Sequence, residues 1–125
     1  MMPSYTYTID KNRGLIRESL VGTITTEFIA EAHQQLHSDK DFKEHYNILV
    51  DFRNCTMDIQ PAETKVAAET HDRMFEPTLA KTAILVGSPR VAAMVLLVTG
   101  NIKTRLTECF STEEAALAWL EATTQ

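Results

Sequence analysis

A strand that is apolar on both faces is the feature of this sequence that most limits its fold. Residues 46–52 read YNILVDF, an apolar run that ends at Asp51. A second run, AILV, occupies residues 83–86. Such strands must be covered on both sides, which is typical of parallel strands inside an α/β layer. The residues between the two runs have a helical pattern, so together they predict a β-α-β unit.

Three further segments have strand patterns. Residues 5–10 and 15–21 are separated by the turn residues KNRG, so we expect an antiparallel hairpin whose second strand stops at Gly22. Residues 105–110 alternate more strictly, as an edge strand does. The sheet is therefore expected to have five strands.

Four helices are expected between and after these strands. The first begins near Thr25, the second at Pro61, and the third runs from a Ser88 cap to Gly100, which we expect to be left-handed. The fourth follows a capping box at residues 111–114, which read STEE. The inner face of the second helix is expected to carry Val66, Ala67, Thr70 and Met74.

The resulting element order is β-β-α-β-α-β-α-β-α, an α/β fold with a five-stranded mixed sheet in a single domain over residues 1–125. Right-handed crossovers between strands in chain order would place the first three helices on one face. The other face then needs a cover. The fourth helix, a reversed strand order or a second copy of the chain could each supply it.

Bulk properties exclude several classes of function. A net charge of −5 and a pI near 5.3 leave no basic stripe for nucleic acid or for an anionic membrane surface. The longest apolar run, residues 91–98, is far shorter than a membrane span, which needs about 20 residues. No signal sequence is recognised at the N-terminus, so a cytoplasmic protein is expected. Cys55 and Cys109 fit no metal or redox spacing.

The strongest candidate for a ligand or partner site is the loop expected after the central strand. Its polar residues are Asp51, Arg53, Asn54, Thr56 and Asp58. Ligands of α/β proteins usually lie at the carboxyl ends of strands, where backbone amides and polar side chains meet. The competing interpretation is that these residues only form a turn and cap the next helix.

Two other patterns are better explained without a ligand. Residues 87–90, GSPR, could hold an anion at a helix start, but capping alone accounts for them. His33 and His37 have the spacing of zinc-binding helices, yet a solvated helix face is the better interpretation. No catalytic constellation is found, and no metal or cofactor is expected.

The third helix has no polar face. Residues 91–98 read VAAMVLLV, and an exposed apolar surface of this kind usually marks an interface or a ligand site. We expect it to form a homodimer interface. The contributing residues would be Val91, Met94, Val95, Leu97 and Val98. Alternatively, the chain's own core encloses the helix.

Three stretches resemble the SpoIIAA-like branch of the STAS superfamily: LVDFR at residues 49–53, AILVG at 83–87 and FSTEEAALAWL at 110–120. The resemblance covers nearly the whole chain. It implies a five-stranded mixed sheet, similar in shape also to CRAL-TRIO lipid-binding domains. The classical antagonists of anti-sigma factors carry a phosphorylated Asp-Ser-Ser/Thr-Gly motif, whereas residues 55–61 read CTMDIQP, with Thr56 as the only hydroxyl.

The leading hypothesis is therefore a non-enzymatic interaction or regulatory module that self-associates through residues 89–100 or binds another protein. The alternative is a carrier or sensor of a lipid-like or other apolar small molecule, held between the second and third helices. A third class, a phosphoregulated antagonist, would require modification of Thr56.

Overall fold

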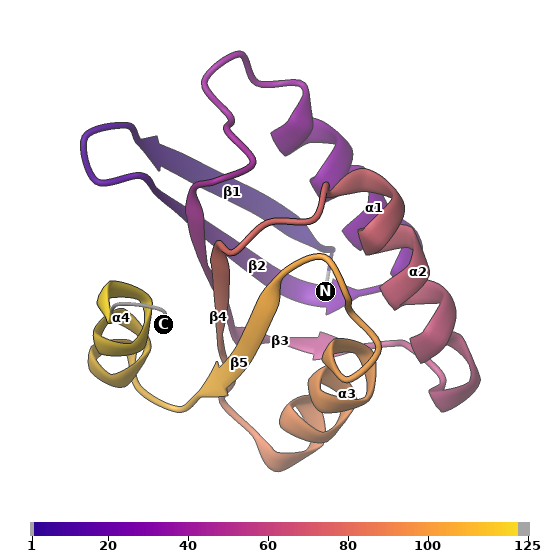
Figure 1. Ribbon diagram of the computed structural model, residues 1–125. Helices are drawn as coiled ribbons and strands as arrows, with labels where there is room; N and C mark the ends of the chain where they lie inside the picture. The colour runs from indigo at the N-terminus through magenta and orange to yellow at the C-terminus, as the bar shows by residue number, and fades with distance from the viewer. Residues whose placement is uncertain (1, 123–125) are drawn as a thin grey trace.

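A five-stranded sheet, with its strands in chain order, forms the centre of the computed structural model, which describes residues 2–122 (Figure 1). β1 pairs antiparallel with β2, and β2 through β5 are parallel. This confirms the predicted mixed sheet with an N-terminal hairpin. The strands are β1 (Ser4–Asp10), β2 (Leu15–Ile24), β3 (Asn47–Met57), β4 (Lys81–Leu85) and β5 (Leu106–Phe110).

The helices divide unequally between the two faces of the sheet (Figure 1). One face carries α1 (Thr26–His37), α2 (Thr64–Met74) and α3 (Pro89–Thr99), and a 3-10 turn, Pro61–Glu63, leads into α2. This is the arrangement that right-handed crossovers between successive neighbouring strands produce. The opposite face is covered by α4 (Glu113–Glu121). Of the three covers considered above, the fourth helix is the one observed.

Both faces of the central strands are buried, in two separate apolar cores. Along β3, Ile48 and Val50 face the core beneath α1–α3, whereas Leu49 faces the core beneath α4. The alternation follows from the two-residue period of a strand. The smaller core consists of Leu15, Leu49, Ala83, Leu85, Ala116 and Leu120.

The carboxyl end of α4 is held by two polar side chains from the middle of the sheet. Lys81 Nζ donates to the carbonyl oxygens of Trp119 at 2.7 Å and Ala122 at 2.8 Å. Asn47 Nδ2 donates to the Leu120 carbonyl at 3.1 Å, and Asn47 Oδ1 accepts from the Lys81 amide at 2.9 Å. These bonds satisfy carbonyls that a helix end leaves without partners, and they place a buried lysine among acceptors.

The strands β2 and β3 extend further than the sequence predicted. β2 continues through Gly22 to Ile24, and residues 55–57, expected as part of a loop, pair with this extension. Gly22 does not end the strand, because it stays paired with Cys55 of β3, although its φ is positive at 98°. A side chain at that position would lie 2.6 Å from the Met2 carbonyl oxygen, so only glycine fits there.

Local differences also occur at three helices. Gly100 is right-handed, with φ −61°, because its amide bonds directly to the carbonyls of α3. The cap of α4 is Thr112, whose hydroxyl accepts from the Ala115 amide at 3.2 Å, rather than Ser111. In α2 the expected inner face is wrong at Val66, which is 53% exposed, whereas Ala67, Thr70 and Met74 are partly buried. The buried residues are Thr64, Ala68 and His71.

We predict that Lys81→Met will lower the free energy of unfolding by about 2–3 kcal/mol. The substitution keeps the apolar stem but removes charged hydrogen bonds and leaves helix carbonyls without donors. Urea denaturation of both proteins measures the change. Lys65→Met, at an exposed position on α2, is the matched control and should differ from the wild type by less than about 0.5 kcal/mol. Equal stability of the Lys81 and Lys65 variants would contradict this account of α4.

Candidate functional site

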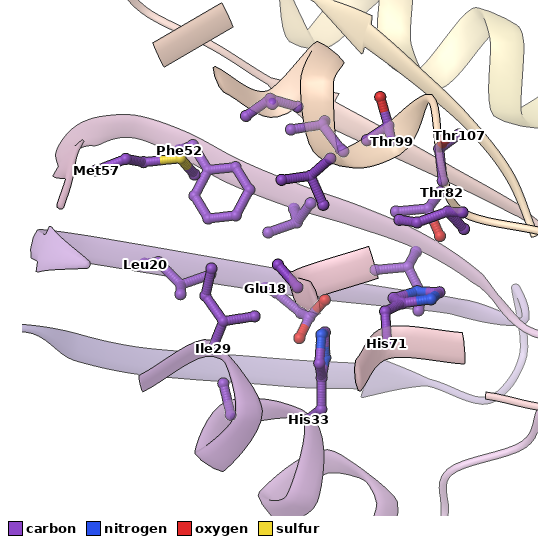
Figure 2. A pocket seen from close by; sticks show the side chains of 18 of the residues that line it. Glu18, Leu20, Ile29, His33, Phe52, Met57, His71, Thr82, Thr99 and Thr107 are labelled. Carbon is purple, nitrogen blue, oxygen red and sulfur yellow. The ribbon is translucent and has the colours of Figure 1, made fainter. Parts of the chain in front are cut away.

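A cavity of about 100 Å³ lies between the sheet and the three helices of its larger face (Figure 2). Its floor comes from β2, β3, β4 and β5, and its walls come from α1, α2 and α3 together with the loops beside them. Most of the lining is apolar. Representative lining residues are Leu20, Ile29, Val50, Phe52, Ala67 and Val95.

One end of the cavity is polar because the inward row of β2 is interrupted by a carboxylate. Ile16, Glu18 and Leu20 are spaced two residues apart and therefore lie on the same face of β2. Ile16 and Leu20 are buried in the larger core. Glu18 lines the cavity and points into it (Figure 2). An acidic side chain is thus held in an otherwise apolar row.

The Glu18 carboxyl is held from one side only. The Tyr5 hydroxyl donates to Oε2, and among the described residues no hydrogen bond reaches Oε1. Burial raises the pKa of Glu18 to about 7, against the opposing effects of the Tyr5 hydrogen bond and the positive charge of Arg105. Burial and the neighbouring Glu18 raise the pKa of Tyr5, so the phenol stays protonated.

Two histidines from different helices face this end of the cavity. His33 of α1 lies edge-on to His71 of α2, with ring centroids 5.4 Å apart, and edge-on to Phe75 at 5.3 Å. His71 stacks on Phe75 at 4.3 Å. The sequence prediction of a solvated face for His33 and His37 is wrong, because both rings turn inward to pack against Phe75.

The imidazole of His33 is neutral and lacks a partner on one nitrogen. Burial, followed by the charges of His71 and His37, lowers the pKa of His33 to about 3. Its Nδ1 is buried without a hydrogen bond among the described residues. Burial also lowers the pKa of His71, although its hydrogen bond to Asp72 opposes the shift. Near neutral pH, both rings therefore act as uncharged hydrogen-bonding groups.

Arg105 places a buried positive charge beside this end of the cavity, but its N–H groups donate to oxygen atoms of the protein. Its guanidinium donates to the carbonyl oxygens of Glu44 at 2.9 Å and Tyr46, and to Thr82 Oγ1 at 3.0 Å. Burial lowers its pKa to about 10, which leaves it charged at neutral pH. Arg105 thus stabilises β5 and the loop before β3, and its field partly offsets the Glu18 carboxylate.

The predicted loop site is also hollow, and its groove adjoins the first cavity, since Phe52, Met57 and Ile59 line both. Arg53, Thr56 and Asp58 line a groove of about 680 Å³ that continues to the start of α3. Asp51 and Asn54 do not line it. Arg53, Thr56 and Asn54 lie on β3 itself rather than in a loop. The groove's other lining residues include Gly87, Ser88, Arg90 and Met94.

Two polar side chains of this groove, Arg53 and Thr56, have partners elsewhere on the sheet. Arg53 donates from Nε to Asp51 Oδ1 at 3.0 Å and from Nη2 to Oδ2 at 2.9 Å, and these hydrogen bonds lower the pKa of Asp51. Thr56 lies beside Thr23 at 3.4 Å between their hydroxyl oxygens, within the strand pair rather than at the start of α2. Gly87 allows close approach to β3, since a Cβ there would lie 2.9 Å from the Arg53 carbonyl oxygen.

The residues predicted to form an interface on α3 differ in their exposure. Val91 and Val95 are 6% and 3% exposed and belong to the chain's own core, so neither can form an external surface. Met94 and Val98 are partly buried. Leu97 is 49% exposed, and its neighbour Leu96 is 58% exposed. The inner apolar residues of α3 pack on the sheet. Its exposed apolar surface is centred on these two leucines.

Sequence reasoning missed the residues at the polar end of the cavity. Glu18 could have been found from its place between Ile16 and Leu20 in the inward row of a strand. His33 and His71 are 38 positions apart in the chain and meet only through the packing of α1 on α2. No local sequence pattern indicates that contact.

Two features are absent from residues 2–122. No group of three or more His, Cys, Asp or Glu side chains in this part of the chain is arranged to hold a metal ion. Within the same range, no helix has the length and hydropathy needed to span a bilayer.

Comparison with known proteins confirms the resemblance seen in the sequence. A family model described as SpoIIAA-like matches residues 15–121. The chain is also similar to a crystal structure of an uncharacterized protein of the DUF3478 family with a SpoIIAA-like fold, from Shewanella loihica. The two share 15% identity over 96% of each chain, with a TM-score of 0.62. At this identity the likeness shows the fold alone. No curated protein matches the sequence.

The cavity should give the protein a pH dependence of stability in which two groups oppose each other. Between about pH 4.5 and 7 the native state holds a Glu18 proton that the unfolded chain has released, so this group makes stability fall as pH rises. Between about pH 3 and 6.5 the unfolded chain binds a proton on His33 that the native state does not, so stability rises with pH. The two slopes should largely cancel in their common window.

Glu18→Gln should remove the contribution of Glu18 to the pH dependence of stability, so that the contribution of His33 remains. From pH 5 to 6.5 we expect its free energy of unfolding to rise by about 1 kcal/mol more per pH unit than that of the wild type, close to the value for one proton. His33→Phe should shift the slope in the opposite direction. Urea denaturation at a series of pH values measures both, with Glu27→Gln at an exposed site on α1 as control. Parallel profiles for all four proteins would refute the buried titrations.

Proposed function

The chain belongs to the SpoIIAA-like family, and we propose that it is a non-catalytic regulatory module that binds a small apolar molecule in the cavity beneath α1, α2 and α3. The observation that carries the proposal is the cavity itself, which is walled by all three helices of one face and floored by four strands. The SpoIIAA-like fold suggests a regulatory or interaction role. A ligand bound in the cavity would allow a small molecule to regulate such a module.

The size of the cavity favours a compact ligand. Its volume of about 100 Å³ is somewhat below that of an engineered apolar cavity of about 150 Å³ that stays dry and binds benzene. One ring or a short branched chain is the scale that fits. A long acyl chain is not, which narrows the lipid-like alternative to small molecules or to one arm of a larger molecule.

The lining favours an apolar body with few polar contacts. Side chains such as Leu20, Val50 and Phe52 would make dispersion contacts with a ligand and release it from water. The ionisable groups Glu18, His33 and His71 lie at one end, and the other polar lining residues are threonines on β4, α3 and β5 (Figure 2). Ligand pockets commonly have this composition, with apolar walls and a small number of orienting polar groups.

We predict that benzene, used as a probe, will stabilise the wild-type protein and that Ala67→Leu will weaken this effect. Ala67 lines the cavity from α2, and a larger side chain there occupies the ligand's volume. At ten times its Kd, benzene should raise the free energy of unfolding by about 1.4 kcal/mol. Thermal unfolding over a benzene titration gives the affinity, which we expect to fall by about tenfold or more in the variant, as expected when an added side chain overpacks the filled site.

Ala93→Leu is the matched control, since it makes the same substitution at an exposed position on α3. It should leave the benzene titration unchanged. Native mass spectrometry of the purified protein supplies a second readout, because a ligand carried through purification adds mass. Absence of both a retained ligand and benzene binding would end this proposal.

A second candidate function is self-association through the outer face of α3. It is supported by Leu96 and Leu97, adjacent leucines that expose 58% and 49% of their surface. Paired apolar side chains at a helix surface are suited to packing against a partner, and a two-fold homodimer would bury the same pair twice. The candidate surface is smaller than the sequence predicted, because Val91 and Val95 lie inside the subunit.

If the protein self-associates in this way, Leu96→Glu and Leu97→Glu should each dissociate the dimer at micromolar concentration, because a charge would be buried without a partner. Analytical ultracentrifugation measures the state, and circular dichroism checks the fold. Val66→Glu is the control, since Val66 is similarly exposed at 53% but lies on α2. A wild-type protein that sediments as a monomer would rule out this candidate.

A further inference from the structure

Building on the proposed ligand cavity, we propose that its ligand carries one hydroxyl group on a compact apolar body, as in a small phenol or alcohol. The hydroxyl would donate to Glu18 and form its second hydrogen bond with His33. The geometry points to this pair because both side chains project into the same end of the cavity from opposite walls, Glu18 from β2 and His33 from α1 (Figure 2).

The first argument is the free acceptor on Glu18. Its Oε2 accepts from the Tyr5 hydroxyl, while the described residues provide no donor for Oε1. The carboxylate can accept several hydrogen bonds. A donor on the ligand would occupy a position that the protein leaves open on the cavity side.

The second argument is the buried nitrogen of His33. Its Nδ1 has no hydrogen-bond partner among the described residues, and it is shielded from solvent. A polar atom in this state is unfavourable, and most native structures pair such atoms with protein, water or ligand. A hydroxyl is at once a donor and an acceptor. It therefore donates its hydrogen to Glu18. Its oxygen accepts from His33 when the neutral ring carries its hydrogen on Nδ1.

The third argument concerns charge. A carboxylate ligand would put a second negative group against Glu18, and the nearby cation cannot receive it, because Arg105 donates to Glu44, Tyr46 and Thr82. An ammonium ligand would be attracted by Glu18, but it would lose its hydration in an apolar cavity beside the positive charge of Arg105, and it offers no acceptor for an Nδ1–H of His33. A hydrocarbon would leave both Glu18 and His33 without partners. An uncharged hydroxyl avoids all three costs.

The experiment compares four probes built on one ring: benzene, phenol, benzoate and benzylamine. Isothermal titration calorimetry of each with the wild-type protein gives the order of affinities. At pH 8, where Glu18 is mostly ionised, we expect phenol to bind about tenfold more tightly than benzene, as expected for a hydrogen bond to a charged group in a buried site. Benzoate and benzylamine should bind more weakly than phenol.

Two variants then locate the preference. Glu18→Leu and His33→Phe should each remove most of the advantage of phenol over benzene, measured as the ratio of the two affinities within the same variant, because each removes one of the two hydrogen-bonding groups. Glu27→Leu, at an exposed position on α1, is the matched control for the first substitution and should keep the advantage.

The outcomes separate this inference from the function on which it depends. If benzene and phenol bind wild-type protein equally, or if benzoate or benzylamine binds most tightly, the hydroxyl preference is refuted and the ligand cavity stands. If none of the four probes binds, the proposed function fails as well. The wild-type series decides between these outcomes even where a variant does not fold.

Discussion

The packing of α4 on the second face of the sheet is the interaction on which the rest of the structure depends. Strands in chain order place α1, α2 and α3 together on one side, so Leu49, Ala83 and Leu85 would face water without α4. Two side chains from β3 and β4 hold its carboxyl end, Asn47 and Lys81. The helix that covers one face is therefore held by polar side chains from β3 and β4. The opposite face encloses the cavity.

The order and type of the elements could be predicted because they follow from hydrophobic periodicity and end signals, which are local. What failed depends on partners distant in the chain. β3 extends past Phe52 only because the end of β2 is there to pair with it, and β2 continues through Gly22, which stays paired with Cys55 at a positive φ. On α2, two of the buried positions hold Thr64 and His71 while Val66 is exposed, so apolar residues alone do not mark the whole inner face.

The candidate site was harder to predict than the fold for a related reason. The sequence directs attention to the carboxyl ends of the strands, where Arg53, Thr56 and Asp58 do line a groove, but there Arg53 is already paired with Asp51. The unpaired polar groups lie instead in the middle of the sheet-helix layer. They are brought together by tertiary packing alone, and Glu18 in its apolar row is the single local sign of them.

Stability does not explain the polar end of the cavity. Burial raises the pKa of Glu18 and lowers that of His33, and each shift means that one protonation state is disfavoured relative to the unfolded chain. Apolar side chains of similar size at these positions would complete the core and are often neutral or stabilising in place of buried charges. Perturbed ionisable groups at a cavity are a recurring mark of functional sites. The fold is stabilised at α4 and the sheet, so the opposite layer can tolerate this local cost, which is consistent with the proposed ligand cavity.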